Sequence, residues 1–350
     1  MRSTAHAVLE TMRLPNGLYV ASRSPDYRYV WIRDVCYIVL AYLDAADDNR
    51  FEQAYHKMLD IFHHYSWKLD YHAEHRPHEV YEYIHPRYHA DTLEELTEPW
   101  GNAQNDAIGA FLFGIGLGLQ HGKRMLRDER DEYLIQQFIR YLTTLRYWQD
   151  ADNGIWEEHR EVHASSIGAC TAGLLALMPF FAIDWSVVQK GMSALFNILP
   201  RESASKESDL AQLSLVYPYR LLPPSMARLL IEQVERQLLR ERGVIRYLGD
   251  CYYERDGREA EWCLGIPWLG LCWLTLNERD KAAAYLRWTE QIMPEPGVLP
   301  ESYYGGTAQA NPNTPLAWAV SMYIQLLDQM ETSYSYTAAV SNDRPNRPTT

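Results

Sequence analysis

The sequence predicts an all-α fold, an (α/α)6 barrel in which six inner helices are surrounded by six outer helices. Helical periodicity recurs along most of the chain, and signals for strands are few. Amphipathic segments also alternate with segments that are apolar on all sides. A helix that is apolar all round must be buried all round, whereas an amphipathic helix lies at a surface. This alternation therefore indicates an inner and an outer ring.

The expected helices belong alternately to the outer and the inner ring, beginning with an outer one. They are predicted at residues 2–13, 33–46, 50–70, 105–120, 129–148, 165–179, 184–199, 207–217, 223–241, 259–276, 278–293 and 314–328. The outer helix at 223–241 has an apolar stripe on one face and arginines and glutamates on the other. The inner helix at 207–217 is short, because Pro218 stops it.

The inner helix at 105–120 is unusually rich in glycine. Gly109, Gly114, Gly116 and Gly118 would let neighbouring inner helices approach closely. The alternative is a merely flexible helix, since each glycine costs about 1 kcal/mol relative to alanine.

Connections from an outer helix to the next inner helix are predicted to be long and rich in aromatic and acidic residues. They span residues 14–32, 71–104, 149–164, 242–258 and 294–313. In a barrel of antiparallel helical hairpins these connections share one rim. Carboxylates that are distant in the sequence are therefore expected to meet there.

Length and composition limit the organisation of the chain. Its 350 residues, 47% of them hydrophobic, can bury a large core. We predict a single barrel domain at residues 1–331 and a poorly ordered C-terminal tail at residues 332–350, where helical periodicity is lost and Ser, Thr, Asn and Pro accumulate. The sequence does not indicate an oligomeric state.

Charge and cysteine usage exclude several classes of partner. The net charge is −13 and no long basic run occurs, so neither nucleic acid nor an anionic membrane is an expected partner. No run of about 18 apolar residues occurs, so no membrane span is predicted. The five cysteines are scattered and mostly lie in apolar stretches, which favours buried free thiols in a reducing compartment. Residues 1–14 lack the apolar core of a signal peptide, so the expected location is the cytoplasm.

Two connections place a glutamate among aromatic residues directly before an apolar helical segment. They read GIWEE at residues 154–158 and PESYY at residues 300–304. Two glutamates brought together in an aromatic pocket suit acid–base cleavage of a glycosidic bond. Trp156 beside Glu157 would exclude water from that carboxyl group, as a general acid requires. For the first segment alone, the alternative is a surface turn with an acidic helix start.

Aromatic residues next to these carboxylates are candidates for stacking on the apolar faces of sugar rings. They are Trp31, Trp100, Trp156, Tyr303 and Tyr304. No glycine-rich phosphate loop is present. The spacing His72-x-x-His75-x-x-His78 would suit a metal, but no Cys joins it and no HExxH register occurs, so neither a metal nor a cofactor is predicted.

Polar residues at the starts of two inner helices have a functional and a structural interpretation. Arg33 and Asp34 could recognise sugar hydroxyls, or Asp34 could cap its helix with Arg33 paired to it. Gln104 and Asp106 could bind hydroxyls or brace neighbouring carboxylates, and capping of the helix at 105–120 is the alternative.

Arg246 in the fourth connection is a further candidate. It could clamp substrate hydroxyls or orient Glu158, and a structural ion pair is equally compatible with its position.

Five segments, in this order, resemble the catalytic module of glucoamylases, the family 15 glycoside hydrolases. They are Trp31–Asp34, Trp100–Asp106, Ile155–Glu158, Arg246–Asp250 and Glu301–Tyr303. The resemblance implies an (α/α)6 barrel that inverts the anomeric configuration of α-glucosides. It implies Glu157 as general acid and Glu301 as general base. It also places Arg33, Asp34 and Arg246 around the terminal glucose, with Trp100 and Glu158 lining the pocket.

Other segments are similar to a regulatory relative. Ser302 follows Glu301 where the family often has Gln, and Asn102 stands where a basic residue is frequent. Residues 163–168 and 318–323 resemble the glucoamylase-like domain of phosphorylase kinase α and β subunits. The sequence therefore predicts an inverting glycosidase that acts on α-linked gluco-oligosaccharides. A non-catalytic glucan-sensing domain is the alternative, and a phosphorolytic reaction is a third possibility.

Overall fold

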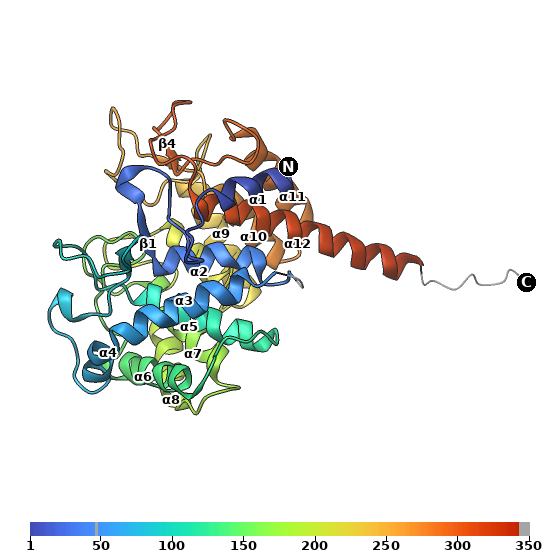
Figure 1. Ribbon diagram of the computed structural model, residues 1–350. Coiled ribbons are helices and arrows are strands. Elements are labelled where there is room, and N and C mark those ends of the chain that lie inside the picture. The colour runs from blue at the N-terminus through green and yellow to red at the C-terminus, as the bar shows by residue number, and fades with distance from the viewer. Residues whose placement is uncertain (46–47, 343–350) are drawn as a thin grey trace, which may run out of the picture.

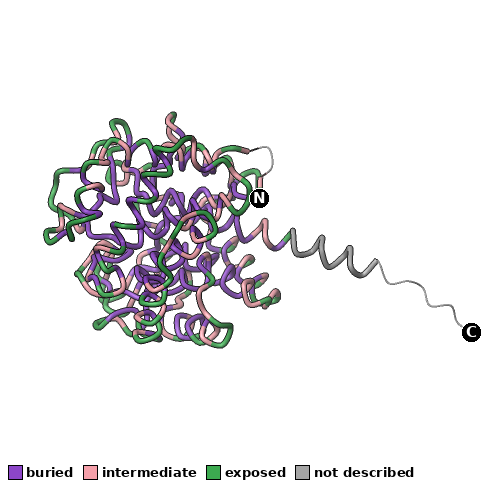
Figure 2. The backbone as a smooth tube through the Cα atoms, turned by 90° about the horizontal axis from the view of Figure 1, so that it is seen from below, coloured by how far each residue is buried: buried purple, intermediate pink, exposed green. Residues whose placement is uncertain are grey.

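The apolar segments form an inner ring in the computed structural model, which describes residues 1–45 and 48–342. The inner elements are α2 (Ile32–Val39), α5 (Asn105–Gln120), α7 (Ala164–Leu177), η4 (Leu210–Leu215), α10 (Gly265–Thr275) and α12 (Ala317–Asn342). Each contacts the next in this order, and α12 contacts α2, which closes the ring. Figure 2 shows the consequence: buried backbone gathers inside, and exposed backbone lies around it.

The amphipathic helices pack around this ring (Figure 1). They are α1 (Arg2–Glu10), α3 (Arg50–His64), α4 (Ser66–His72), α6 (Glu129–Leu145), α8 (Trp185–Ile198), α9 (Pro224–Leu238) and α11 (Arg279–Gln291). Thus α1 packs on α12, α3 on α2, α8 on α7, α9 on η4 and α11 on α10. The predicted all-α (α/α)6 barrel is confirmed.

Element boundaries differ from the prediction at several places. The expected helix at 50–70 is interrupted at Tyr65, between α3 and α4. The inner element expected at 207–217 is only a short 3-10 helix, η4, in which the Asp209 side chain accepts a hydrogen bond from the amide of Ala211 and Pro218 follows closely. The helix expected from residue 259 begins at Gly265, because the residues before it form a strand.

The last helix, α12, continues to Asn342 rather than ending at residue 328. Residues 343–350 of the predicted tail lie outside the described residues, and the division into domain and tail stays a prediction. Within residues 1–45 and 48–342, no helix combines the length and the apolar character needed to cross a lipid bilayer.

Two glycines of α5 allow the close approach that their sequence context predicted. A Cβ atom on Gly109 would collide with the backbone of Ala169 in α7. A Cβ on Gly116 would lie 2.6 Å from the backbone carbonyl carbon of Ala176, at the other end of the same helix pair. Since real Cβ atoms do not approach this closely, α5 and α7 pack with their backbones nearly touching along their length.

Short strands tie the rim connections together. β1 (Tyr29–Trp31) pairs antiparallel with β2 (Arg87–His89), and β3 (Glu261–Trp262) pairs antiparallel with β4 (Ser302–Tyr303). The single turns η1 (Pro25–Tyr27), η2 (Leu40–Tyr42) and η3 (Val80–Glu82) complete the elements. Long connections are thereby held in place by backbone hydrogen bonds.

Candidate active site

A cavity of about 560 Å³ is walled by residues of the rim connections. It contains most of the residues predicted from sequence: Trp31, Arg33, Asp34, Trp100, Trp156, Glu157, Glu158, Arg246 and Glu301. A larger cavity of about 890 Å³ is lined by residues at the opposite ends of inner helices, such as Leu117 and Leu274, and holds none of these residues. The smaller cavity is therefore the candidate active site, because it is where the carboxylates and aromatic side chains converge.

Glu157 projects into the cavity from a tight turn. Its amide donates to the carbonyl oxygen of Gly154 over 3.1 Å, and its φ of 62° lies in the left-handed region that residues other than glycine seldom adopt. The Nε1–H groups of Trp31 and Trp100 donate to its Oε1 and Oε2, each over 2.7 Å. Arg33 Nη2 adds a bond of 3.3 Å to Oε1. Strained backbone held by several partners is a feature of functional positions.

Glu301 lies in a drier environment and is 1% exposed. Tyr27 donates to its Oε1 over 2.6 Å, Asn313 donates to its Oε2 over 2.8 Å, and Asn311 also donates to Oε2. Burial raises the pKa of Glu301, and the hydrogen bonds from Tyr27, Asn313 and Asn311 act in the opposite direction. Its donors are all neutral, whereas Glu157 also contacts a cation.

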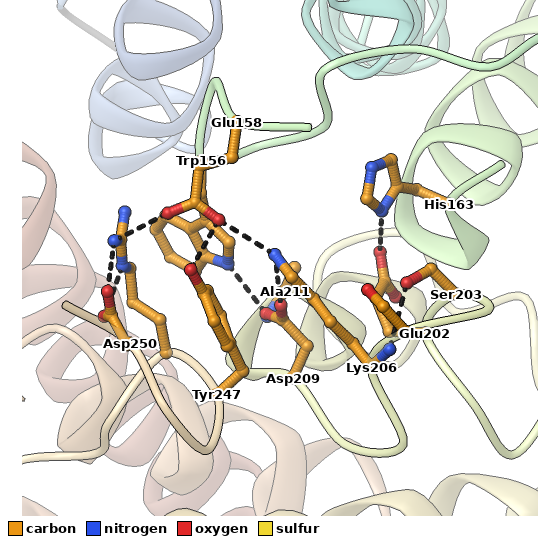
Figure 3. Close-up of polar contacts among 12 residues, drawn as sticks. Trp156, Glu158, His163, Glu202, Ser203, Lys206, Asp209, Ala211, Tyr247 and Asp250 are labelled. Atoms are coloured by element: carbon orange, nitrogen blue, oxygen red, sulfur yellow. Dashed lines mark hydrogen bonds and ion pairs between the residues drawn. The ribbon is translucent and has the colours of Figure 1, made fainter. Parts of the chain in front are cut away.

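Glu158 points into a cluster of charges beside the turn that carries Glu157 (Figure 3). Its Oε1 accepts from Arg246 Nη2 over 2.9 Å, and its Oε2 accepts from the Tyr247 hydroxyl over 2.7 Å. Arg246 is held in turn by Asp250, at 2.7 Å and 2.5 Å. Burial opposes ionisation of Glu158, but the charges of Arg246 and Lys206 outweigh it and lower the pKa of this carboxyl. Arg246 thus orients Glu158, one of the alternatives left open by the sequence.

Lys206 and Asp209 complete this cluster, and the sequence did not single them out. Lys206 Nζ lies 3.1 Å from Glu158 Oε2 and 3.5 Å from Asp209 Oδ2. Asp209 Oδ1 accepts from the Nε1–H of Trp156 over 2.7 Å, so one cation braces both neighbours of Glu157. Both residues lie between α8 and η4; Lys206 falls in the short segment between the helices expected at 184–199 and 207–217, and Asp209 falls within the second of these. The barrel alternation itself was the signal, because it requires a rim connection there.

Arg33 anchors a second buried cluster behind the cavity. Its Nη1 donates to Gln104 over 3.0 Å and to Asp106 over 3.2 Å, and its Nε lies 3.7 Å from Asp34 Oδ1. Burial raises the pKa of Asp34 to about 7; Arg33 opposes this rise, and the nearby charge of Glu157 adds to it. Gln104 and Asp106 therefore brace Arg33 from behind and do not line the cavity.

Tyr303 does not line the cavity either. Its hydroxyl donates to the carbonyl oxygen of Ile292 over 2.6 Å, and the ring points away from the cavity. We therefore no longer include Tyr303 among the residues that would contact a sugar. Several lining residues had not been predicted: Tyr27, Arg87, Tyr252, Tyr253, Trp262 and Trp318.

The histidine spacing that suggested a metal serves local structure. A nitrogen of His72 contacts the carbonyl oxygen of His75 at 2.8 Å, and one of His75 contacts that of Tyr71 at 2.9 Å. In the part of the chain that the structure describes, no cluster of three or more His, Cys, Asp or Glu side chains has an arrangement suited to a metal ion.

Fold and cavity together define a helical barrel with glycoside hydrolase architecture. The model of the family described as Glycosyl hydrolases family 15 matches residues 3–182, and the chain belongs to this family.

Curated relatives include regulatory proteins. The chain is 27% identical over 281 residues to a probable phosphorylase b kinase regulatory subunit alpha from Caenorhabditis elegans. The aligned region covers 64% of this chain and 23% of that protein. It is 28% identical over 192 residues to the skeletal muscle isoform of this subunit from Mus musculus, covering 48% of this chain and 15% of that protein. The chain therefore spans less than a quarter of the length of these relatives.

Solved structures share the fold over nearly the whole chain. A wild-type glycosidase has a TM-score of 0.80 at 21% identity, with 94% of this chain and 96% of that chain covered. A variant of a glycosidase in complex with glucose has a TM-score of 0.82 at 21% identity, with the same coverage. Glucoamylase from Hormoconis resinae has a TM-score of 0.71 at 15% identity, covering 100% of this chain and 75% of that one.

Proposed function

We propose that this chain is an inverting glycoside hydrolase that releases glucose from α-linked gluco-oligosaccharides. Glu157 is the general acid and Glu301 the general base. The observation that carries the proposal is that both glutamates line one aromatic cavity of about 560 Å³. Two carboxyl groups that converge on one sugar-sized cavity are what acid–base cleavage of a glycosidic bond requires.

The hydrogen bonds of Glu157 support a different role for each of its two oxygens. Its Oε1 accepts from both Trp31 and Arg33, whereas among residues 1–45 and 48–342 Oε2 accepts only from Trp100. A protonated carboxyl oxygen still has capacity to accept one hydrogen bond while it donates another. We therefore assign the catalytic proton to Oε2, from which it passes to the glycosidic oxygen of the substrate.

The same reasoning applies to Glu301. Its Oε2 accepts from Asn311 and Asn313, whereas Oε1 accepts only from Tyr27 in the part of the chain that the structure describes. Oε1 thus has an acceptor position left for a water molecule. In an inverting reaction this carboxylate removes a proton from the water that attacks the opposite face of the sugar, which requires the two carboxyl groups to be about 6.5–9.5 Å apart.

Glucose release by the purified protein tests the proposal. Maltose, isomaltose, trehalose and maltotriose are incubated with the wild type and with Glu157→Gln, and free glucose is assayed. We expect turnover of at least one substrate by the wild type and a loss of about 10²–10⁴-fold in the variant. Glu74→Gln, a change at an exposed glutamate outside the cavity, is the matched control. Full activity of Glu157→Gln would refute the assignment.

The anomer formed first tests the stereochemistry. Inversion at an α-glucoside yields β-glucose, which proton NMR resolves before mutarotation equilibrates the products. Initial α-glucose would indicate retention and remove Glu301 from its role as a base.

A glucan-sensing domain without turnover is the second candidate, favoured by the similarity to phosphorylase b kinase regulatory subunits. Calorimetric binding of the same sugars without glucose release would support it.

A cytoplasmic location is part of our proposal, and it fits the five free cysteines, four of which are buried.

A further inference from the structure

Arg87 is a buried cation in the wall of the candidate active site. It lies on β2 directly opposite Trp31 of β1, it is 6% exposed, and it lines the cavity. Its guanidinium carbon lies 4.3 Å from the ring centroid of Trp100, 4.9 Å from that of Tyr29 and 5.5 Å from that of Trp31. Three aromatic faces therefore fix the plane and position of this group.

The guanidinium of Arg87 lacks the carboxylate partners of the two other arginines in the cavity wall. Arg33 pairs with Asp106 at 3.2 Å, and Arg246 pairs with Glu158 at 2.9 Å. Within residues 1–45 and 48–342, the Arg87 guanidinium forms no hydrogen bond or ion pair, and its Nε is buried without a partner.

The surroundings leave this cation short of acceptors. Burial lowers the pKa of Arg87, and the charges of Glu157 and Glu98 oppose the decrease without forming an ion pair. The Nε of Arg87 is buried without a partner, which is unfavourable, and the guanidinium as a whole has no acceptor among the described residues, so the position suits a ligand that brings an acceptor.

We propose that Arg87 binds a carboxylate carried by the sugar unit next to the glucose that is released, so that the preferred substrate is an α-glucoside of a sugar acid. This inference rests on the proposed function. A planar guanidinium matches a carboxylate through two parallel hydrogen bonds. A single negative charge fits better than two, because Glu157 and Glu98 lie near enough to act on Arg87 through space. The remainder of the cavity, with Glu158 and Glu301 in its wall, accommodates the neutral glucose unit.

Matched substrates test the preference. Maltobionate and maltitol differ only in a carboxylate that replaces a hydroxymethyl group, and the corresponding α-1,6 pair covers the other linkage. We expect kcat/KM of the wild type to be at least tenfold higher for the acid than for the alditol of one pair. Trehalose 6-phosphate against trehalose is the third pair; an equal preference for the phosphate would contradict the choice of a single charge.

Variants assign the preference to Arg87. Arg87→Met should reduce the acid-to-alditol ratio below twofold, and Arg87→Lys, which keeps the charge but loses the planar fork, should retain part of it. Glu98→Gln removes a competing carboxylate and should raise the ratio. Arg28→Met is the control: Arg28 is exposed and pairs with Asp91 at 3.0 Å, so the ratio should not change. A ratio near one in the wild type, or a high ratio that survives in Arg87→Met, overturns the proposal.

Binding separates this inference from the proposed hydrolysis. If the wild type releases glucose from none of these compounds, dissociation constants for the same pairs are measured by calorimetry. A tenfold tighter binding of the acid that depends on Arg87 then supports the carboxylate site although the hydrolase proposal fails. Equal binding, or no binding of the acids, overturns the inference independently of turnover.

Discussion

Replacing Lys206 by methionine should destabilise the protein and loosen the turn that carries Glu157. Lys206 Nζ lies 3.1 Å from Glu158 Oε2 and 3.5 Å from Asp209 Oδ2, and its side chain is 12% exposed. Methionine keeps most of the apolar stem and removes the charge. The perturbation therefore reports on the two ion pairs together with the contact between Nζ and the Tyr247 ring, whose centroid is 3.8 Å away.

The expected loss of stability depends on which partners Glu158 and Asp209 retain when Lys206 is replaced. Removing one partner of a buried ion pair costs about 3–5 kcal/mol. Glu158 retains Arg246 and Tyr247, so most of the cost falls on Asp209, whose Oδ2 has no hydrogen bond. Protonation of Asp209 limits the loss, and we expect about 2–3 kcal/mol in the free energy of unfolding. With an unfolding entropy of about 0.7 kcal/mol/K for a chain of this length, Tm should fall by about 3–4 °C.

The loss should depend on pH with a definite sign. Burial raises the pKa of Asp209 from 3.8 to about 6, and Lys206 opposes this rise, so the variant has a still higher value. Because the pKa of Asp209 is higher in the folded than in the unfolded state, stability is lost as pH increases through the pKa of the folded state. In the variant that pKa is higher, so the loss continues above pH 6. The pKa of Glu158 is lowered partly by Lys206, so Lys206 contributes stability through Glu158 above pH 4.5. Both effects make the deficit smaller at pH 5 than at pH 8.

Urea denaturation of the wild type and Lys206→Met at pH 5 and pH 8 measures the deficit. Lys190→Met is the matched control, because Lys190 is exposed and its Nζ only overlies the ring of Trp148 at 5.1 Å. The control should change stability by less than about 0.5 kcal/mol. A Lys206→Met deficit that is absent, or equal at the two pH values, would refute the bridging role.

Two further changes test the general base and the close helix packing. Tyr27→Phe removes the hydrogen-bond donor that lies 2.6 Å from Glu301 Oε1. Burial raises the pKa of Glu301 and this hydrogen bond opposes the rise, so the pKa should increase in the variant. The acidic limb of the pH profile of kcat/KM for glucose release should therefore move to higher pH. An unmoved limb would show that Glu301 is not the titrating base. Gly109→Ala forces a methyl group against the backbone of Ala169 and should cost about 1–3 kcal/mol in chemical denaturation. Gly118→Ala meets a flexible methionine side chain and should cost less, and the reverse order would contradict the packing argument.

The barrel could be predicted because burial determines the pattern of each helix. Segments such as 164–177 are apolar all round since they contact neighbours on all sides, and this pattern survives without any knowledge of topology. Alternation then specified which connections share a rim, and the structure places Glu157 and Glu301 on one cavity as that rule requires.

Side-chain partners could not be predicted in the same way. Arg87 comes from a short strand inside a long connection, and only its pairing with β1 brings it beside the cavity. Lys206 lies in a short polar segment between two expected helices, and Asp209 precedes η4 although the sequence predicts a helix from residue 207. Tyr303 follows Glu301 closely in sequence, yet its hydroxyl donates to the carbonyl oxygen of Ile292 and its ring does not line the cavity. Such orientations depend on backbone pairing that no local pattern specifies.

The environment of Glu301 bears on the choice between an enzyme and a sugar-binding domain. A carboxyl group that is 1% exposed and contacts only neutral donors costs stability when it is ionised. Binding of sugar hydroxyls could use a neutral amide at this position without that cost. Tyr27 and Asn313 nevertheless hold the carboxylate through opposite oxygens and leave Oε1 an acceptor position. The cost of ionising Glu301, together with its remaining acceptor position, supports our proposal of turnover.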